Sequence, residues 1–183
     1  RTKDAVTEAA SHRLLVRAPT PEKLASLSIG EIEPLIFPVG FYHTKAKHLR
    51  ETCRILLKDY GGAVPRSMEE LLKLPGVGRK TANLVLTIGF GDNGICVDTH
   101  VHRISNIWGY VRTKTPEETE FALRKKLPRR HWKTFNDILV TFGQNLCVPV
   151  SPGAANARLP DIARKSGLSV PDSISGCGSL PPL

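Results

Sequence analysis

The sequence predicts an all-α fold for most of its 183 residues. Apolar residues recur with the helical period along the chain, and the alternation that is typical of strands hardly appears. From Thr44 to Tyr60, for example, Ala46, Cys53 and Leu56 fall on one face of a helix, with lysines and arginines on the others. The two glycines at 61 and 62 would end this helix, because glycine readily adopts the left-handed conformation that follows many helices.

Capping boxes predict the starts of three further helices. In each, a serine or threonine is followed three residues later by a glutamate: Ser28 with Glu31, Ser67 with Glu70, and Thr115 with Glu118. The segment from Thr81 to Phe90 is apolar on nearly every side, which predicts a buried central helix. A last apolar stripe predicts one more helix and consists of Trp132, Phe135, Ile138, Leu139, Phe142 and Leu146.

Charge and composition favour a soluble protein that meets a polyanion. The chain has 26 Lys and Arg against 17 Asp and Glu, a formal net charge of +9 and a pI near 9.7, which makes nucleic acid the leading partner. No apolar run reaches the length of a membrane span, so no membrane contact is expected. The cysteines at 53, 96, 147 and 177 have no short repeated spacing, and nothing at the start resembles a secretory signal. An intracellular, reducing compartment is therefore expected.

The two ends of the chain differ from its middle. The sequence opens at Arg1 without a methionine and enters a helical-looking segment at once, so we expect that a segment upstream has been removed. From Ser166 to Leu183 there is too little apolar surface to offset the entropy of ordering the chain, which predicts a disordered tail.

A glycine hairpin between two predicted helices is the strongest local feature. Pro75 would end the first helix, and Gly76, Val77 and Gly78 would present successive backbone amides to one side. The next helix starts directly behind these amides and carries Arg79 in its first turn, so the amides would form a phosphate-binding site. The alternative is a tight turn between helices that binds nothing.

Lys80 and Asp98 suggest chemistry beyond phosphate binding. Lys80 falls in the first turn of the predicted buried helix, where the helix dipole and desolvation would both disfavour an ammonium ion and so favour a nucleophilic amine. Asp98 follows eighteen residues later and would cap the helix that starts at Thr99. A carboxylate there could also stabilise positive charge that develops on a sugar. A lysine that contacts phosphate and a carboxylate that only caps a helix are the simpler alternatives.

These residues resemble a known family. The runs 74–83 (LPGVGRKTAN) and 97–103 (VDTHVHR) resemble the helix-hairpin-helix DNA glycosylases, most closely the endonuclease III family, and the resemblance covers about residues 1–165. It implies a two-lobed all-α fold. One lobe, 22–128, would carry the hairpin and the catalytic residues, and 1–21 plus 129–165 would form a second, incomplete lobe.

The resemblance also implies an activity, with a role for each matching residue. A monomer would act as a DNA glycosylase and abasic-site lyase on oxidised pyrimidines in duplex DNA. The amine of Lys80 would attack C1′ and form a Schiff base, and β-elimination would then cut the strand, with Asp98 as the assisting carboxylate. His100 would contact a phosphate beside Asp98.

The same resemblance implies that a loop opens the duplex. Residues 40–45 (GFYHTK) look like the family's wedge loop, in which Phe41 intercalates and Tyr42, His43 and Lys45 lie beside the DNA. The alternative for Phe41 is a buried aromatic residue that anchors a turn. Arg1 falls where the family carries a residue that probes the space of the orphaned base.

The chain departs from the family at its iron-sulfur site. Relatives ligate a four-iron four-sulfur cluster through cysteines spaced C-x6-C-x2-C-x5-C. Counting from Cys147, this chain has Ala154, Ala157 and Ala163 at the other three positions. Alanine provides no thiolate, so we expect no cluster and no other cofactor. We also expect the loop 148–164 to be less firmly ordered, and the half that lacks the cluster and the upstream helix to be destabilised.

Two other functions compete with the bifunctional enzyme. The chain could be a non-catalytic helix-hairpin-helix module, or an inactive remnant of the enzyme, in which Lys80 only adds charge to a phosphate-binding hairpin. It could also be a glycosylase without lyase activity. The resemblance disfavours the latter, because such relatives generally lack lysine at the position of Lys80.

Overall fold

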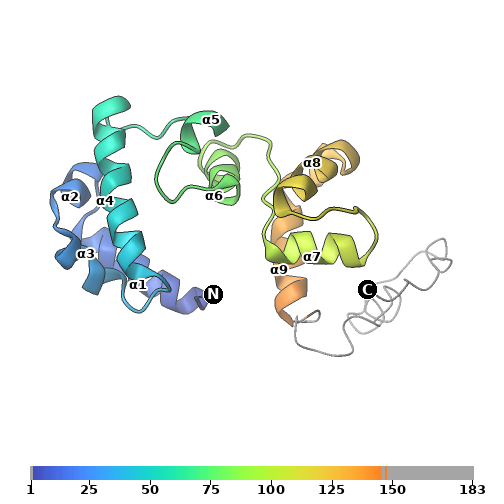
Figure 1. Cartoon of the computed structure of the whole chain (residues 1–183), viewed down its shortest axis with the longest axis horizontal. Coiled ribbons are helices and arrows are strands. Elements are labelled where there is room, and N and C mark those ends of the chain that lie inside the picture. The colour runs from blue at the N-terminus through green and yellow to red at the C-terminus, as the bar shows by residue number, and fades with distance from the viewer. Residues whose placement is uncertain (1, 146, 148–183) are drawn as a thin grey trace. The chain divides into compact units, whose positions relative to one another are not determined.

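The predicted all-α fold is confirmed. The computed structural model describes residues 2–145 and 147, and within this part of the chain every regular element is a helix (Figure 1). Two compact units result, Arg1–Asp92 and Asn93–Leu183. Within the described part, no helix combines the length and the apolar character needed to cross a bilayer.

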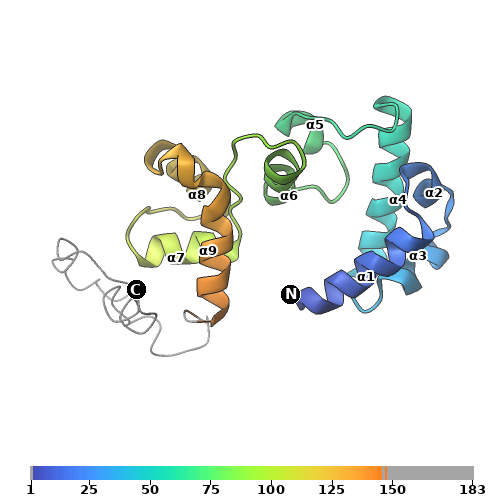
Figure 2. The same ribbon diagram turned by 180° about the vertical axis from the view of Figure 1, so that it is seen from behind.

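The first unit is built around one long helix, α4. Its elements are α1 (Asp4–Arg17), α2 (Pro21–Ser26), α3 (Ile29–Ile36), α4 (Tyr42–Asp59), α5 (Met68–Leu71), α6 (Arg79–Leu84) and a π-helical segment, Val85–Gly89. Ala46 and Cys53 on α4 pack into a core with residues of α1, α2 and α3. Leu56, near the end of α4, packs instead with Leu71 and Leu74 beside α5. Helix α4 therefore contributes to both cores of this unit. Figure 2 shows α4 beside α1, α2 and α3.

The three predicted helix starts are confirmed by their caps. The side chains of Ser28, Ser67 and Thr115 each accept a hydrogen bond from the backbone amide three residues later. At Ser28 the box is reciprocal, because Glu31 accepts from the backbone amide of Ser28 at 2.8 Å. These bonds satisfy amides that a helix leaves without partners at its first turn.

Residues 81–89 are helical as predicted, but the prediction that this helix is buried is wrong. Only Ala82 and Asn83 are buried in α6, and the side chain of Ile88 is 79% exposed. At Val85 the helix widens into π geometry, in which the amide of Phe90 donates to the carbonyl of Val85. One face of this helical segment packs on the core beside α5, so apolar residues on its opposite face are exposed to solvent.

The second unit begins with a segment without regular secondary structure, in which Ile95, Cys96 and Val97 are buried. Its helices are α7 (Thr99–Ile107), α8 (Pro116–Lys126), a 3₁₀ turn (Arg129–His131) and α9 (Trp132–Asn145). They enclose one apolar core, in which Ile104 and Leu123 are fully buried.

The predicted stripe on the last helix is wrong at Ile138. Its side chain is 60% exposed, while Asn136 and Gly143 are buried beside Trp132 and Leu139. The buried face follows the spacing 132, 136, 139, 143, and two of these positions are not apolar. Asn136 keeps its place because its Nδ2 donates to the carbonyl of Cys96 at 3.1 Å.

The predicted lobes, 22–128 and 1–21 plus 129–165, stay a prediction. Helix α1 packs against α3 within the first unit, and α9 packs against α7 within the second. The predicted positions at Arg1, in the loop 148–164 and in the tail 166–183 lie outside the described residues.

Candidate active site

The glycine hairpin joins α5 to α6 in the first unit. Gly76 has φ +76°, a conformation that favours glycine, and the amide of Val77 donates to the carbonyl of Leu74 at 3.1 Å. Gly78 is the N-cap of α6 and has φ −96°, which any residue adopts. A Cβ at Gly78 would have no atom within 4 Å. This side of the hairpin is open.

Helix α4 holds the hairpin from the other side. A Cβ at Gly76 would lie 2.7 Å from Nδ1 of His48, so the ring of His48 lies against the turn. The hydroxyl of Thr52, one helical turn further along, donates to the carbonyl of Pro75 at 3.1 Å. The sequence gives no signal for these two contacts, because nothing local distinguishes His48 and Thr52 from other residues of α4.

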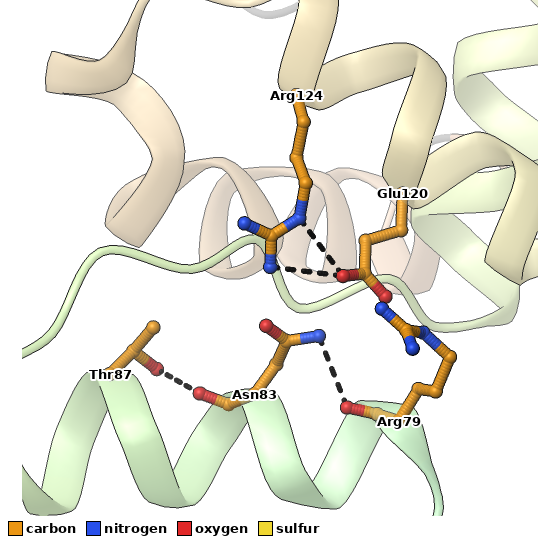
Figure 3. A network of polar contacts seen from close by, with 5 residues as sticks. All are labelled: Arg79, Asn83, Thr87, Glu120 and Arg124. Carbon is orange, nitrogen blue, oxygen red and sulfur yellow. Dashed lines mark hydrogen bonds and ion pairs between the residues drawn. The ribbon is translucent and has the colours of Figure 1, made fainter. Parts of the chain in front are cut away.

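Arg79 and Lys80 are the first two residues of α6. The side-chain Nδ2 of Asn83 donates to the carbonyl of Arg79 at 3.1 Å, and the hydroxyl of Thr87 donates to the carbonyl of Asn83 at 2.7 Å (Figure 3). Lys80 lies in the first turn, as predicted, but its side chain is exposed. The predicted burial of Lys80 is therefore wrong.

The loop before α4 presents an aromatic side chain to solvent. Phe41 is the N-cap of α4, has φ +59° in the left-handed region, and is 68% exposed. The alternative of a buried aromatic anchor is therefore wrong. Tyr42 turns back and packs edge-on against Phe37, and Nδ1 of His43 lies 2.7 Å from Oε1 of Glu33. Lys45, one turn into α4, is exposed.

Two residues near the start of the described chain hold this loop in place. Arg13 on α1 donates from Nε to the carbonyl of Leu35 at 2.9 Å and from Nη2 to the carbonyl of Phe37. The amide of Gly40 donates to the hydroxyl of Thr2 at 3.0 Å. Neither residue has a local signal in the sequence, since both act only through tertiary contact.

The first unit therefore brings the two predicted DNA-contacting loops onto one helix. Phe41 lies at the start of α4, and His48, which contacts the hairpin, follows seven residues later, roughly 10 Å along the helix axis. A rigid helix between them keeps their separation constant.

In the second unit, Asp98 caps α7 as predicted. Its Oδ1 accepts a hydrogen bond from the amide of Val101 at 2.9 Å, and the side chain is half-buried. The buried segment 95–97 before it fixes where the cap lies. The structure thus orients this carboxylate at the start of a helix.

His100 packs against α9. A Cβ at Gly143 would clash with Nδ1 of His100, so glycine allows the ring to approach the helix backbone. Nδ1 is buried and has no hydrogen-bond partner among residues 2–145 and 147. If His100 meets a phosphate, only Nε2 can do so, and that role stays a prediction.

The side chains at the expected cluster site do not fit a four-cysteine cluster. Cys147 is 3% exposed and packs in the core of the second unit. Its Sγ accepts a hydrogen bond from Nη1 of Arg103 at 3.1 Å, and its carbonyl accepts one from Nη2. The three alanines lie outside the described residues, but alanine has no ligand atom. Within the described part, no group of three or more metal-ligating side chains occurs.

The fold is helical and has a glycine hairpin, a lysine just after it and an aspartate at the next helix start. These features define the class of helix-hairpin-helix DNA-repair proteins. Residues 1–129 match the profile of the HhH-GPD superfamily of base excision DNA repair proteins. Endonuclease III of Thermotoga maritima is 52% identical over 83% of this chain and 71% of its own length. The chain belongs to the endonuclease III family.

A further relative and a solved structure agree with this family membership. Endonuclease III homolog 2, chloroplastic, of Arabidopsis thaliana is 42% identical over 96% of this chain, which spans about half of that protein (48%). A solved structure of a trapped endonuclease III–DNA covalent intermediate has a TM-score of 0.79 and 34% identity, and the match covers 90% of this chain and 79% of that one.

Proposed function

We propose that this chain is a base-excision DNA glycosylase with abasic-site lyase activity, which acts on oxidised pyrimidines in duplex DNA through a Schiff base at Lys80. The class of activity rests on membership of the endonuclease III family. The observation that supports the lysine chemistry is an exposed Lys80 in the first turn of α6, directly after a hairpin whose Gly78 side is open.

The reaction runs in two stages at one sugar. The neutral amine of Lys80 attacks C1′, and the damaged base leaves with the electrons of the glycosidic bond. After the nitrogen loses a proton, its lone pair breaks the bond from C1′ to O4′, O4′ takes up a proton, and the sugar opens to a protonated imine. Removal of a C2′ proton then expels the 3′ phosphate, and water releases the lysine. Asp98 stabilises the positive charge that develops at C1′ while the base departs.

DNA binding places the sugar for this attack. The amides of the hairpin take a backbone phosphate on the open side at Gly78. Phe41 fills the gap that the flipped nucleotide leaves in the stack, which suits an exposed aromatic side chain on a turn held by Arg13 and Thr2. The partner is duplex DNA with a damaged base or an abasic site, the chain acts as a monomer, and no step uses a cluster.

Borohydride trapping tests the lysine chemistry. A duplex with one abasic site should give a covalent adduct with the parent chain, and Lys80→Ala should abolish it. Lys58→Ala removes an exposed lysine of α4 and should leave the adduct unchanged. An adduct that persists in Lys80→Ala would refute Lys80 as the nucleophile.

A non-catalytic DNA-binding module is the second candidate, favoured by the alanines at 154, 157 and 163. It predicts that the parent chain binds the abasic duplex but forms no adduct. A duplex with an oxidised pyrimidine, compared with one that carries an oxidised purine, tests the lesion class separately.

A further inference from the structure

Basic residues gather where α8 ends and α9 begins. Between Phe121 and Asn136 the sequence has six Lys and Arg and no Asp or Glu, whereas twenty Lys and Arg balance seventeen acids in the rest of the chain. Four of the six are exposed at the end of α8 and in the 3₁₀ turn that follows it. We call these four the α8–α9 basic cluster: Lys125, Lys126, Arg129 and Arg130.

Within residues 2–145 and 147, no acidic side chain forms an ion pair with this cluster. The neighbouring Arg124 is paired, because its Nη2 lies 3.0 Å from Oε1 of the buried Glu120 (Figure 3). Lys125, Arg129 and Arg130, in contrast, have no acidic partner in the part of the chain that the structure describes. Repulsion between these cations disfavours the folded unit.

The charges at the start of α9 are also unfavourable to the helix itself. Arg129 and Arg130 lie in the turn that leads directly into α9. The start of a helix carries partial positive charge, so cations there are destabilising. Helix stability therefore does not explain arginine at these two positions.

Aromatic side chains contact two members of the cluster, Lys126 and Arg129. Trp132 is buried, and its Nε1 donates to the carbonyl of Leu127 at 2.8 Å across the turn. The guanidinium of Arg129 lies 5.7 Å from the centre of the Trp132 ring, and Nζ of Lys126 lies 4.5 Å from the centre of the Tyr110 ring. Cations that are already ordered lose less entropy when they bind a ligand.

We propose that the α8–α9 basic cluster is a second binding surface for the phosphate backbone of DNA, in addition to the hairpin. Guanidinium groups match phosphate oxygens with two parallel hydrogen bonds, and lysines add point charges. A partner with regularly spaced negative charges would relieve the repulsion within the cluster. That the polyanion is DNA rests on the proposed function.

The test compares two variants of the full chain with equal charge. One carries Lys125→Gln, Arg129→Gln and Arg130→Gln; the control carries Lys47→Gln, Arg54→Gln and Lys58→Gln, three exposed cations of α4. Binding to an undamaged duplex is measured by fluorescence anisotropy across salt concentrations. Each lost phosphate contact reduces the magnitude of the slope of log K against log salt by about 0.9. The magnitude of the slope should therefore fall by about 2 to 3 in the cluster variant and by less than about 1 in the control.

A charge-preserving variant separates charge from folding. Lys125→Arg with Arg129→Lys and Arg130→Lys should restore most of the slope, and melting temperatures show whether each variant is folded. Equal losses in the cluster and control variants would overturn the proposal in favour of overall charge. An unchanged slope in the cluster variant would overturn it in favour of another partner, such as an acidic protein.

The outcomes also separate this inference from the proposed function. If the slope of log K against log salt falls in the cluster variant and not in the control, but no borohydride adduct forms, only the lyase proposal fails. If the adduct forms but the cluster variant loses no more of the slope than the control, only this inference fails. A parent chain that binds no duplex at all would overturn this inference directly.

Discussion

The two glycines of the hairpin should respond in opposite ways to alanine. Gly76 is needed by the fold, because its φ is +76° and a Cβ would lie 2.7 Å from Nδ1 of His48. Gly78 is not, because its φ is −96° and a Cβ would meet nothing within 4 Å. Gly76→Ala should therefore lower stability, and Gly78→Ala should mainly weaken the binding of DNA.

The magnitudes follow from the geometry. For Gly76→Ala, the left-handed backbone costs about 1–2 kcal/mol, and the displaced ring of His48 adds about 1–3 kcal/mol of overpacking. For Gly78→Ala, the weaker N-cap costs up to about 1 kcal/mol, and the restricted unfolded chain offsets about 0.4–1 kcal/mol of it. The stability of this variant should therefore change by less than about 1 kcal/mol.

Denaturant unfolding and anisotropy on an abasic duplex together check this pair. Gly78→Ala should unfold close to the parent but bind the duplex more weakly, since the methyl group lies where a phosphate would approach. In Gly76→Ala, the added change His48→Ala should recover part of the lost stability, because it removes the ring but not the backbone strain. Parent-like DNA affinity in Gly78→Ala would refute phosphate binding at the hairpin. Parent-like stability in Gly76→Ala would refute the requirement for glycine beside His48.

Two further results are expected. Arg13→Ala should weaken DNA binding and speed amide exchange around Val39 and Gly40, because the carbonyls of Leu35 and Phe37 lose their donor; parent-like exchange there would show that Arg13 does not hold the loop. Burial, and then the charge of Glu22, raises the pKa of the Cys53 thiol, so little thiolate forms at about pH 8. Mass spectrometry after iodoacetamide treatment should find Cys53 unmodified until denaturant is added, and rapid modification of the folded chain would contradict its burial.

The sequence predicts features that depend on neighbouring residues and misses those that depend on distant ones. The helix starts at Ser28, Ser67 and Thr115 are confirmed, and the capping box is reciprocal at Ser28, because a cap is complete within four residues. The apolar period placed Ile138 in the core, but the buried face of α9 takes Asn136 and Gly143, which have partners on other elements.

The candidate site shows the same division. The order hairpin, lysine, aspartate can be found from spacing alone, and the structure puts Lys80 in a first turn and Asp98 at a cap. Spacing could not show that Lys80 is exposed, nor that α4 carries both the Phe41 loop and the contact to Gly76. Burial and such contacts arise only when segments pack.

Several residues of this chain are unfavourable or unnecessary within their own unit. Phe41 is a bulky residue in a left-handed conformation with its ring in solvent. Gly78 occupies a position that other residues could fill, and Arg129 and Arg130 put charge at the disfavoured end of a helix. Local rules are broken at functional positions more often than elsewhere, because binding there compensates for lost stability. A duplex with a flipped nucleotide would satisfy all three features: a gap for the ring, a phosphate over the open glycine, and a backbone for the cations.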